Sequence, residues 1–346
     1  MASPQAPIDP ALDQAQANAS VRPAPWWIGP AVAAGIFVVL GVLGGTLNLG
    51  AVTTLTTVLL YAVVAQGWNI LGGYGGYLHF GAALFLGSGA YAAALLNSTF
   101  AWPWWATLLP AALVSVLVSL VIGIATLRLR SHYFAIFTLV LTFVATVVVK
   151  NTPLFGGAMG VYIDAPIDAS GRSLALFVFY VLFVFAIGAT LISYLVQRSN
   201  FGYALRAISE DEPAARVLGV RTVGVKLRAL LLGAALGGGA GAIFAFQTGY
   251  IEPAGAFDVG IALDIVLVCV IGGLATWIGP LIGAVIVVLL EQVLRVVVPQ
   301  LDLFGITFSA ESNRLVLGVL LIVFALFARR GIVGLVTRRR GRVVSV

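Results

Sequence analysis

The sequence predicts an all-α, polytopic membrane protein with about ten transmembrane helices and both termini in the cytoplasm. Hydrophobic residues make up 61% of the 346 residues and charged residues only 9%, and the mean hydropathy of +1.07 is far above that of a soluble domain. Apolar windows of about 20 residues, which a helix needs to cross a ~30 Å hydrocarbon layer, recur between residues 30 and 328. These windows are continuous and do not alternate with period two, so they indicate helices and not a β-barrel.

The order of apolar and basic segments predicts the topology. Basic segments at 128–130, 198–228 and 329–342 should all face the cytoplasm, where Lys and Arg accumulate. An even number of predicted helices separates them, which agrees with both ends lying inside. The expected helices are 30–48, 51–70, 80–97, 106–127, 133–150, 174–196, 227–247, 259–274, 278–298 and 312–328.

Three regions follow from this reading. Residues 1–25 mix Pro, Ala, Gln and Asp without apolar periodicity and predict a disordered cytoplasmic tail. Residues 26–330 form the predicted transmembrane domain, and residues 331–346 form a basic cytoplasmic tail. The formal charge of +6 is concentrated in loops and at the C-terminus, which is typical of membrane orientation, so no nucleic-acid partner is expected.

Catalytic and metal-binding patterns are missing from the sequence. His79 and His132 are the only histidines, and neither has a neighbouring ligand at metal spacing, so we expect both at cytoplasmic helix ends and predict no metal site. A phosphate-binding P-loop needs Lys followed by Ser or Thr, whereas Lys150 precedes Asn and Lys226 precedes Leu. If this protein uses nucleotide energy, another chain must hydrolyse the nucleotide.

A polar segment at 197–228 interrupts the apolar chain and carries nine of its 32 charged residues. Phe201, Leu205 and Ile208 recur at helical spacing, with Arg206 on the opposite side. Ser209 followed by Glu212 resembles a capping box that would start a second short helix. That helix runs through Ala214 and Ala215 and should end at Gly219, a residue suited to the left-handed position. Two short helices of this kind need a partner surface, since they are marginal alone.

Three features of the spans are candidates for a translocation path. The Gly-rich stretch from 72 to 81 breaks the helix pattern after Asn69, and it either lines such a path or forms a tight cytoplasmic turn. A similar Gly-Gly pair ends the helix before 274. Asp264 lies inside a predicted span, where a charge is costly, and serves either transport or a hydrogen bond to a neighbouring helix. The candidate path residues are Asn69, Gly72, Gly73, Gly75, Gly76, Asp264, Gly272 and Gly273.

Four stretches together resemble the permease subunit of bacterial ABC importers of the branched-chain amino acid type, over about residues 55–330. They are GWNILGGYGGYLHFGAALFLGSGAYAAALL (67–96), LRLRSHYFAIFTL (127–139), FGYALRAISEDEPAARVLGV (201–220) and IGGLATWIGPLIGA (271–284). The chain departs from the family pattern at Pro213, inside the second short helix, and at His79 and Phe80, where the family often has a small polar residue.

The resemblance implies a non-catalytic subunit in a bacterial inner membrane, forming half of the translocation path for small amphipathic solutes. Its expected partners are a second, homologous permease, two ATPase subunits that bind ATP and Mg²⁺, an extracytoplasmic solute-binding protein and the lipid membrane. No cofactor is expected on this chain itself. The segment at 197–228 matches the family's ATPase-docking segment, and the residues expected to couple to the ATPase are Phe201, Leu205, Arg206, Glu212, Ala214, Ala215 and Gly219.

Other functions stay open from the residues. Branched-chain or other aliphatic amino acids are the expected solutes, and importers of urea or short amides are the nearest alternative. An ion-coupled secondary transporter is a rival of a different class, and it would need groups such as Asp264 for coupling. A polytopic membrane enzyme is the third hypothesis, disfavoured because the sequence has no metal or nucleophile cluster.

Overall fold

A computed structural model describes residues 28–127, 131–164, 171–297, 302–303, 306–307 and 332. The predictions for residues 1–25, for the helix at 312–328 and for the basic tail at 331–346 lie outside these residues, apart from Ile332. The described part of the chain is dominated by long apolar helices, so the predicted all-α membrane class is confirmed. The total of ten spans and the side of each terminus stay predictions.

The helices coincide with the nine that the sequence predicts before residue 300. They are α2 (Ile28–Thr46), α3 (Leu49–Asn69), α4 (Ala82–Phe100), α5 (Trp104–Thr126), α6 (Ser131–Lys150), α7 (Arg172–Arg198), α10 (Thr222–Thr248), α12 (Val259–Gly272) and α13 (Gly279–Val297). Among the described residues, seven helical stretches are long and apolar enough to cross a membrane: Leu49–Tyr74, Ala82–Phe100, Trp104–Thr126, Ser131–Lys150, Arg172–Arg198, Thr222–Thr248 and Pro253–Gly272.

Shorter elements lie between the long helices. A π-helical turn, η1 (Ile70–Tyr74), continues α3, and α8 (Asn200–Glu210) and α9 (Glu212–Val217) separate α7 from α10. The other short helices are η2 (Pro153–Phe155), η3 (Gly157–Met159) and α11 (Pro253–Ala256). Strand β1 (Val161–Tyr162) pairs antiparallel with β2 (Tyr250–Ile251), and β3 (Asp302–Leu303) pairs antiparallel with β4 (Ile306–Thr307).

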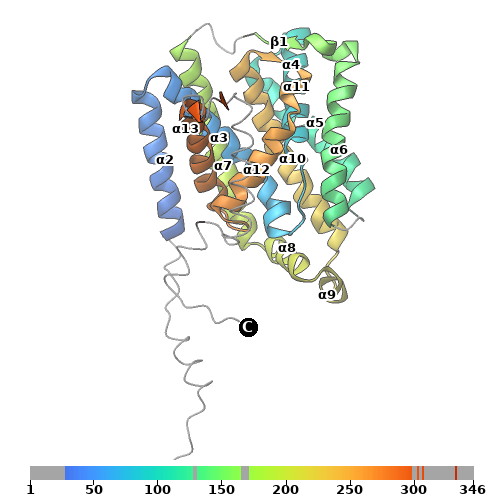
Figure 1. The fold of residues 1–346 in the computed structure, drawn as a ribbon. Coiled ribbons are helices and arrows are strands. Elements are labelled where there is room, and N and C mark those ends of the chain that lie inside the picture. The colour runs from blue at the N-terminus through green and yellow to red at the C-terminus, as the bar shows by residue number, and fades with distance from the viewer. Residues whose placement is uncertain are drawn as a thin grey trace, which may run out of the picture.

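The long helices stand side by side, with short elements at both ends (Figure 1). Helices α8 and α9 lie at one end of this bundle, at the bottom of the view, and β1 and α11 lie at the opposite end. Because the sequence predicts that α8 and α9 are cytoplasmic, the end with β1 is the predicted outer end.

Helix α10 is the centre of the packing, in contact with α3, α4 and α5. Its crossings with α3 and α4 are made by glycine: a Cβ atom added to Gly89 would lie 2.2 Å from the carbonyl oxygen of Gly238, and one added to Gly67 would lie 2.8 Å from that of Gly233. In lipid, helices associate by close packing because burial of apolar surface drives association only weakly there. The glycines let these backbones touch directly.

Candidate functional site

The predicted polar segment forms two short helices, as expected. Ser199 caps α8, its hydroxyl accepting a hydrogen bond from the amide of Gly202 (3.2 Å). Gly219 has a φ of +89°, so the chain leaves α9 in the left-handed conformation predicted for this residue. We call residues 199–221, which connect α7 to α10, the coupling segment.

The predicted capping box is wrong. Helix α8 continues through Ser209 to Glu210, and α9 is capped by Asp211, whose carboxylate accepts a hydrogen bond from the amide of Ala214 (2.9 Å). Asp and Ser are equally good caps, and the sequence offers both within three residues. Pro213 lies in the first turn of α9, where its missing N–H has no helical partner to lose.

The residues that the sequence assigns to ATPase coupling divide into two groups. Leu205 is fully buried and Ala215 is 2% exposed, so both pack against this chain's own helices. Ala214 and Gly219 are exposed, and Phe201 is half-buried. Leu205 and Ala215 therefore do not lie on the exposed surface with Ala214 and Gly219, and a coupling role for each of these residues stays a prediction.

The outward surface of the coupling segment holds two residues that the sequence analysis missed. Val217 and Leu218, at the end of α9, are 88% and 83% exposed. Large apolar side chains at the tip of a polar segment are typical of a protein contact. The only sequence signal for them is their position directly before Gly219.

Glu212 does not face outward but binds to the spans. Its carboxylate accepts hydrogen bonds from the ammonium of Lys226 in α10 (2.8 Å) and from the hydroxyl of Tyr77. The Lys226 ammonium also donates to the Tyr77 hydroxyl (2.9 Å) and lies 4.1 Å from the centre of its ring. Arg216 adds an exposed ion pair to Glu212 at 3.2 Å. We call Tyr77, Glu212 and Lys226 the inner triad.

The charges of the inner triad depend on one another. The Lys226 side chain is only 2% exposed and that of Glu212 is 18% exposed, so neither charge is well hydrated. Burial alone would raise the pKa of Glu212, but the hydrogen bonds from Lys226 and Tyr77 outweigh burial and hold the pKa below its ordinary value of 4.5. The carboxylate therefore stays ionised at neutral pH.

The non-helical stretch 75–81 lies directly against the coupling segment. A Cβ atom added to Gly75 would lie 3.3 Å from the Leu205 side chain, and one added to Gly76 would lie 2.5 Å from the Ser209 hydroxyl. In addition, the Arg206 guanidinium lies 5.8 Å from the centre of the Tyr74 ring. The structure thus brings together two sets of candidate residues that the sequence assigns to coupling and to translocation.

Side-chain amides join this region to the turn between α12 and α13. The Asn69 amide donates to the carbonyl of Thr276 (2.9 Å) and accepts from the amide of Ala275 (3.1 Å). Gln66 donates to the carbonyl of Trp277 (2.7 Å), and Gln197 accepts from its amide (2.9 Å). Three side chains, Gln66, Asn69 and Gln197, therefore satisfy backbone polar groups of the irregular turn at 273–278.

The remaining candidate glycines lie at close contacts within these turns. A Cβ atom added to Gly72 would lie 2.6 Å from the Trp68 ring, and one added to Gly73 would lie 1.8 Å from the Asn69 side-chain amide. A Cβ atom added to Gly272 would lie 1.9 Å from the carbonyl oxygen of Gly279. Gly273 has a φ of +127° and is buried. These positions need glycine for packing, and their part in a translocation path stays a prediction.

Asp264 makes a hydrogen bond to a neighbouring helix, one of the two roles expected for it. It accepts from the Tyr61 hydroxyl of α3 at 3.4 Å. A direct part in transport stays a prediction.

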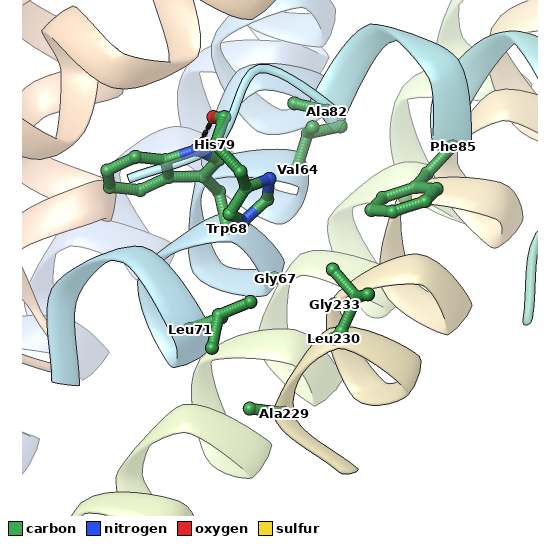
Figure 2. Close-up of a pocket in the computed structure, with 11 residues that line it drawn as sticks. Val64, Gly67, Trp68, Leu71, His79, Ala82, Phe85, Ala229, Leu230 and Gly233 are labelled. Carbon is green, nitrogen blue, oxygen red and sulfur yellow. Dashed lines mark hydrogen bonds between the residues drawn. The ribbon is translucent and has the colours of Figure 1, made fainter. Parts of the chain in front are cut away.

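His79 lies three residues before the start of α4, near a helix end as expected, but its side chain is buried, with 3% exposed. Figure 2 shows its imidazole beside Trp68 and facing Phe85, at the edge of a cavity with room for one water-sized molecule (about 10 Å³) between α3, α4 and α10. The Nδ1 atom finds no hydrogen-bond partner among the described residues. Burial lowers the pKa of His79 to about 3, so the ring is neutral at physiological pH.

Comparisons with known proteins identify the family of this chain. The sequence pattern of the family described as "Branched-chain amino acid transport system / permease component" matches residues 50–325. This chain belongs to that family. The match includes the coupling segment, the inner triad and both Gly-rich turns.

Individual relatives support the same assignment. The permease is 27% identical to the high-affinity branched-chain amino acid transport system permease protein LivM of Salmonella typhimurium, and 26% identical to that of Escherichia coli. Each match covers 82% of this chain and 70% of the relative. The autoinducer 2 import system permease protein LsrC of Salmonella typhi is 31% identical, over 31% of this chain and 32% of the relative. No solved structure matches the permease.

Proposed function

We propose that this permease is the non-catalytic membrane subunit of an ATP-driven importer in a bacterial inner membrane. It forms half of the translocation path, and ATP and Mg²⁺ bind to separate ATPase subunits. The observation that carries the proposal is the two-sided coupling segment. Its outer surface offers Val217 and Leu218 to a partner, while its inner side is joined to the spans through Leu205 and Glu212.

This arrangement suits the transfer of movement from an ATPase. A force on α9 acts on Glu212, which is bonded to α10 through Lys226 and to the 75–81 stretch through Tyr77. Packed helices respond to such a force by discrete shifts. The helices that border a solute path would then tilt when the ATPase subunits close on ATP.

The favoured solutes are branched-chain or other aliphatic amino acids. The two LivM relatives match 82% of this chain, whereas the autoinducer 2 permease matches 31%. Urea or short amides are the alternative solute class. The remaining partners are a second homologous permease and an extracytoplasmic binding protein that delivers the solute.

Copurification combined with uptake tests this function. The tagged permease, isolated from its native membrane, should bring down two ATPase subunits and a second permease. The reconstituted complex should take up radiolabelled leucine or valine only when ATP and the binding protein are both present. Uptake driven by a proton or sodium gradient, with no ATPase in the vesicle, would favour the secondary-transporter hypothesis instead.

A further inference from the structure

The stretch 75–81 is held from two sides. On one side it contacts the coupling segment, through Tyr77 to Glu212 and through Gly76 to Ser209. On the other side it is bonded to the spans: the Trp68 indole of α3 donates to the carbonyl of His79 (2.7 Å), and the amide of Phe80 donates to the Thr138 hydroxyl of α6 (2.9 Å). No regular helix lies between Tyr77 and these contacts at His79 and Phe80. A displacement of Tyr77 is therefore passed to α3 and α6 along no more than three residues of chain.

The surroundings of His79 are suited to movement. The cavity beside the ring has room for one water-sized molecule, and the aromatic neighbours Trp68, Phe134 and Phe85 lie 5.5, 6.1 and 6.4 Å from the ring, centre to centre. Directly beside the cavity, the backbones of α3 and α10 meet at Gly67 and Gly233.

Among the described residues no protein group satisfies the buried Nδ1 atom of His79, so in this state its hydrogen bonding depends on a single water in the adjoining cavity. A polar atom left unsatisfied in an apolar site destabilises the conformation that contains it, and such atoms in native structures require an explanation. A conformation in which His79 meets bulk water or a polar group of the chain removes that dependence. A movement of the 75–81 stretch that exposes His79 would therefore give its Nδ1 atom further hydrogen-bond partners.

We infer that the 75–81 stretch carries movement from α9 to α3 and α6, with Tyr77 as the positioning residue and His79 leaving its cavity in the ATP-bound state. This rests on the proposed function, because it needs an ATPase that moves α9. Neither Tyr77 nor His79 is expected to touch the solute or ATP. The role assigned to Tyr77 is mechanical and lies in its hydroxyl, which links Glu212 and Lys226 to the 75–81 backbone.

The first test replaces only that hydroxyl. Tyr77→Phe keeps the ring that packs on Lys226 and Phe134, and the readout is the number of solute molecules imported per ATP hydrolysed by the reconstituted complex. We expect this ratio to fall severalfold, because the Tyr77 hydroxyl no longer joins Glu212 and Lys226 to the 75–81 stretch. Tyr162→Phe, at an exposed site at the other end of the molecule, is the matched control. A wild-type ratio for Tyr77→Phe in an assembled, ATP-driven importer overturns the inference but leaves the proposed function standing.

The second test uses the unaltered chain, so it does not depend on the variant folding. Diethylpyrocarbonate modifies accessible histidines, and peptide mass spectrometry separates the chain's two histidines, His79 and His132. His132 is exposed and serves as the internal reference. We expect His79 to be unreactive without nucleotide and to become at least about tenfold more reactive, relative to His132, when vanadate traps the complex with ATP. Equal reactivity of His79 in both states, in a complex that transports, overturns the inference.

Discussion

The strongest prediction from the structure concerns the unequal burial of the inner triad. Glu212→Gln removes the negative charge from a pair in which the Lys226 side chain is 2% exposed. The ammonium is then left buried and uncompensated, a change that costs about 3–5 kcal/mol of folding free energy. Lys226→Met leaves Glu212, which is 18% exposed and still bonded to Tyr77 and Arg216, so we expect a smaller loss of about 1–2 kcal/mol.

The double variant tests this reasoning directly. Glu212→Gln combined with Lys226→Met contains no buried charge at this site, so it should be more stable than Glu212→Gln alone. The coupling energy should be about 1–3 kcal/mol. Thermal unfolding of the purified protein in one detergent, followed by intrinsic tryptophan fluorescence, gives the order of the four proteins. Glu210→Gln, a neighbouring exposed carboxylate, is the control and should match wild type. Additive effects, or a Lys226→Met variant less stable than Glu212→Gln, would refute the argument from burial.

Three further predictions concern the docking surface, the packing and the pH dependence. Leu218→Gln should weaken ATPase binding at least about tenfold, measured by pull-down titration, without lowering the melting temperature, since a buried apolar side chain contributes up to ~3 kcal/mol to a contact. Leu154→Gln, at an exposed site at the other end of the molecule, should have no effect. Gly89→Leu should reduce the yield of folded protein on size-exclusion chromatography, because its Cβ would meet the carbonyl of Gly238 at 2.2 Å. The pKa of His79 is about 3 when folded, against an ordinary 6.5, so between these values only the unfolded state binds the proton. Stability is therefore lost as pH falls below 6.5, by ~1.4 kcal/mol at pH 5.5. The His79→Leu variant should lack this contribution to the loss of stability. Melting temperatures that fall equally between pH 7.5 and pH 5.5 in the wild type and in His79→Leu would contradict the prediction.

The sequence is sufficient to locate the helices but not to show which surfaces they contact. Continuous apolar windows locate nine of the observed helices because burial in lipid leaves few alternatives for a long apolar stretch. The Gly-rich stretch is also identified as a break after Asn69. Its π-helical entry, η1, is not predictable, since helical turns with different hydrogen-bond spacing share the same apolar pattern.

Orientation within the coupling segment is the point at which sequence reasoning fails. Helical spacing shows that Leu205 shares a face with Phe201, but the pattern is the same whether that face meets this chain's own spans or another protein. The sequence around Lys226 only excludes a P-loop, since no Ser or Thr follows it, and indicates no partner for its charge. Its ion pair with Glu212 joins residues on either side of a turn, and that geometry becomes visible only when α9 and α10 are placed in space.

The two helices that carry the coupling segment have equal lengths. Helices α7 and α10 are each 27 residues long, about 40 Å, whereas the hydrocarbon layer is ~30 Å thick. Each therefore has ~10 Å to spare, and tilt adjusts how much of it leaves the lipid. We therefore expect lipids with longer or shorter acyl chains to change the distance of the coupling segment from the membrane surface, and with it the position at which an ATPase can bind.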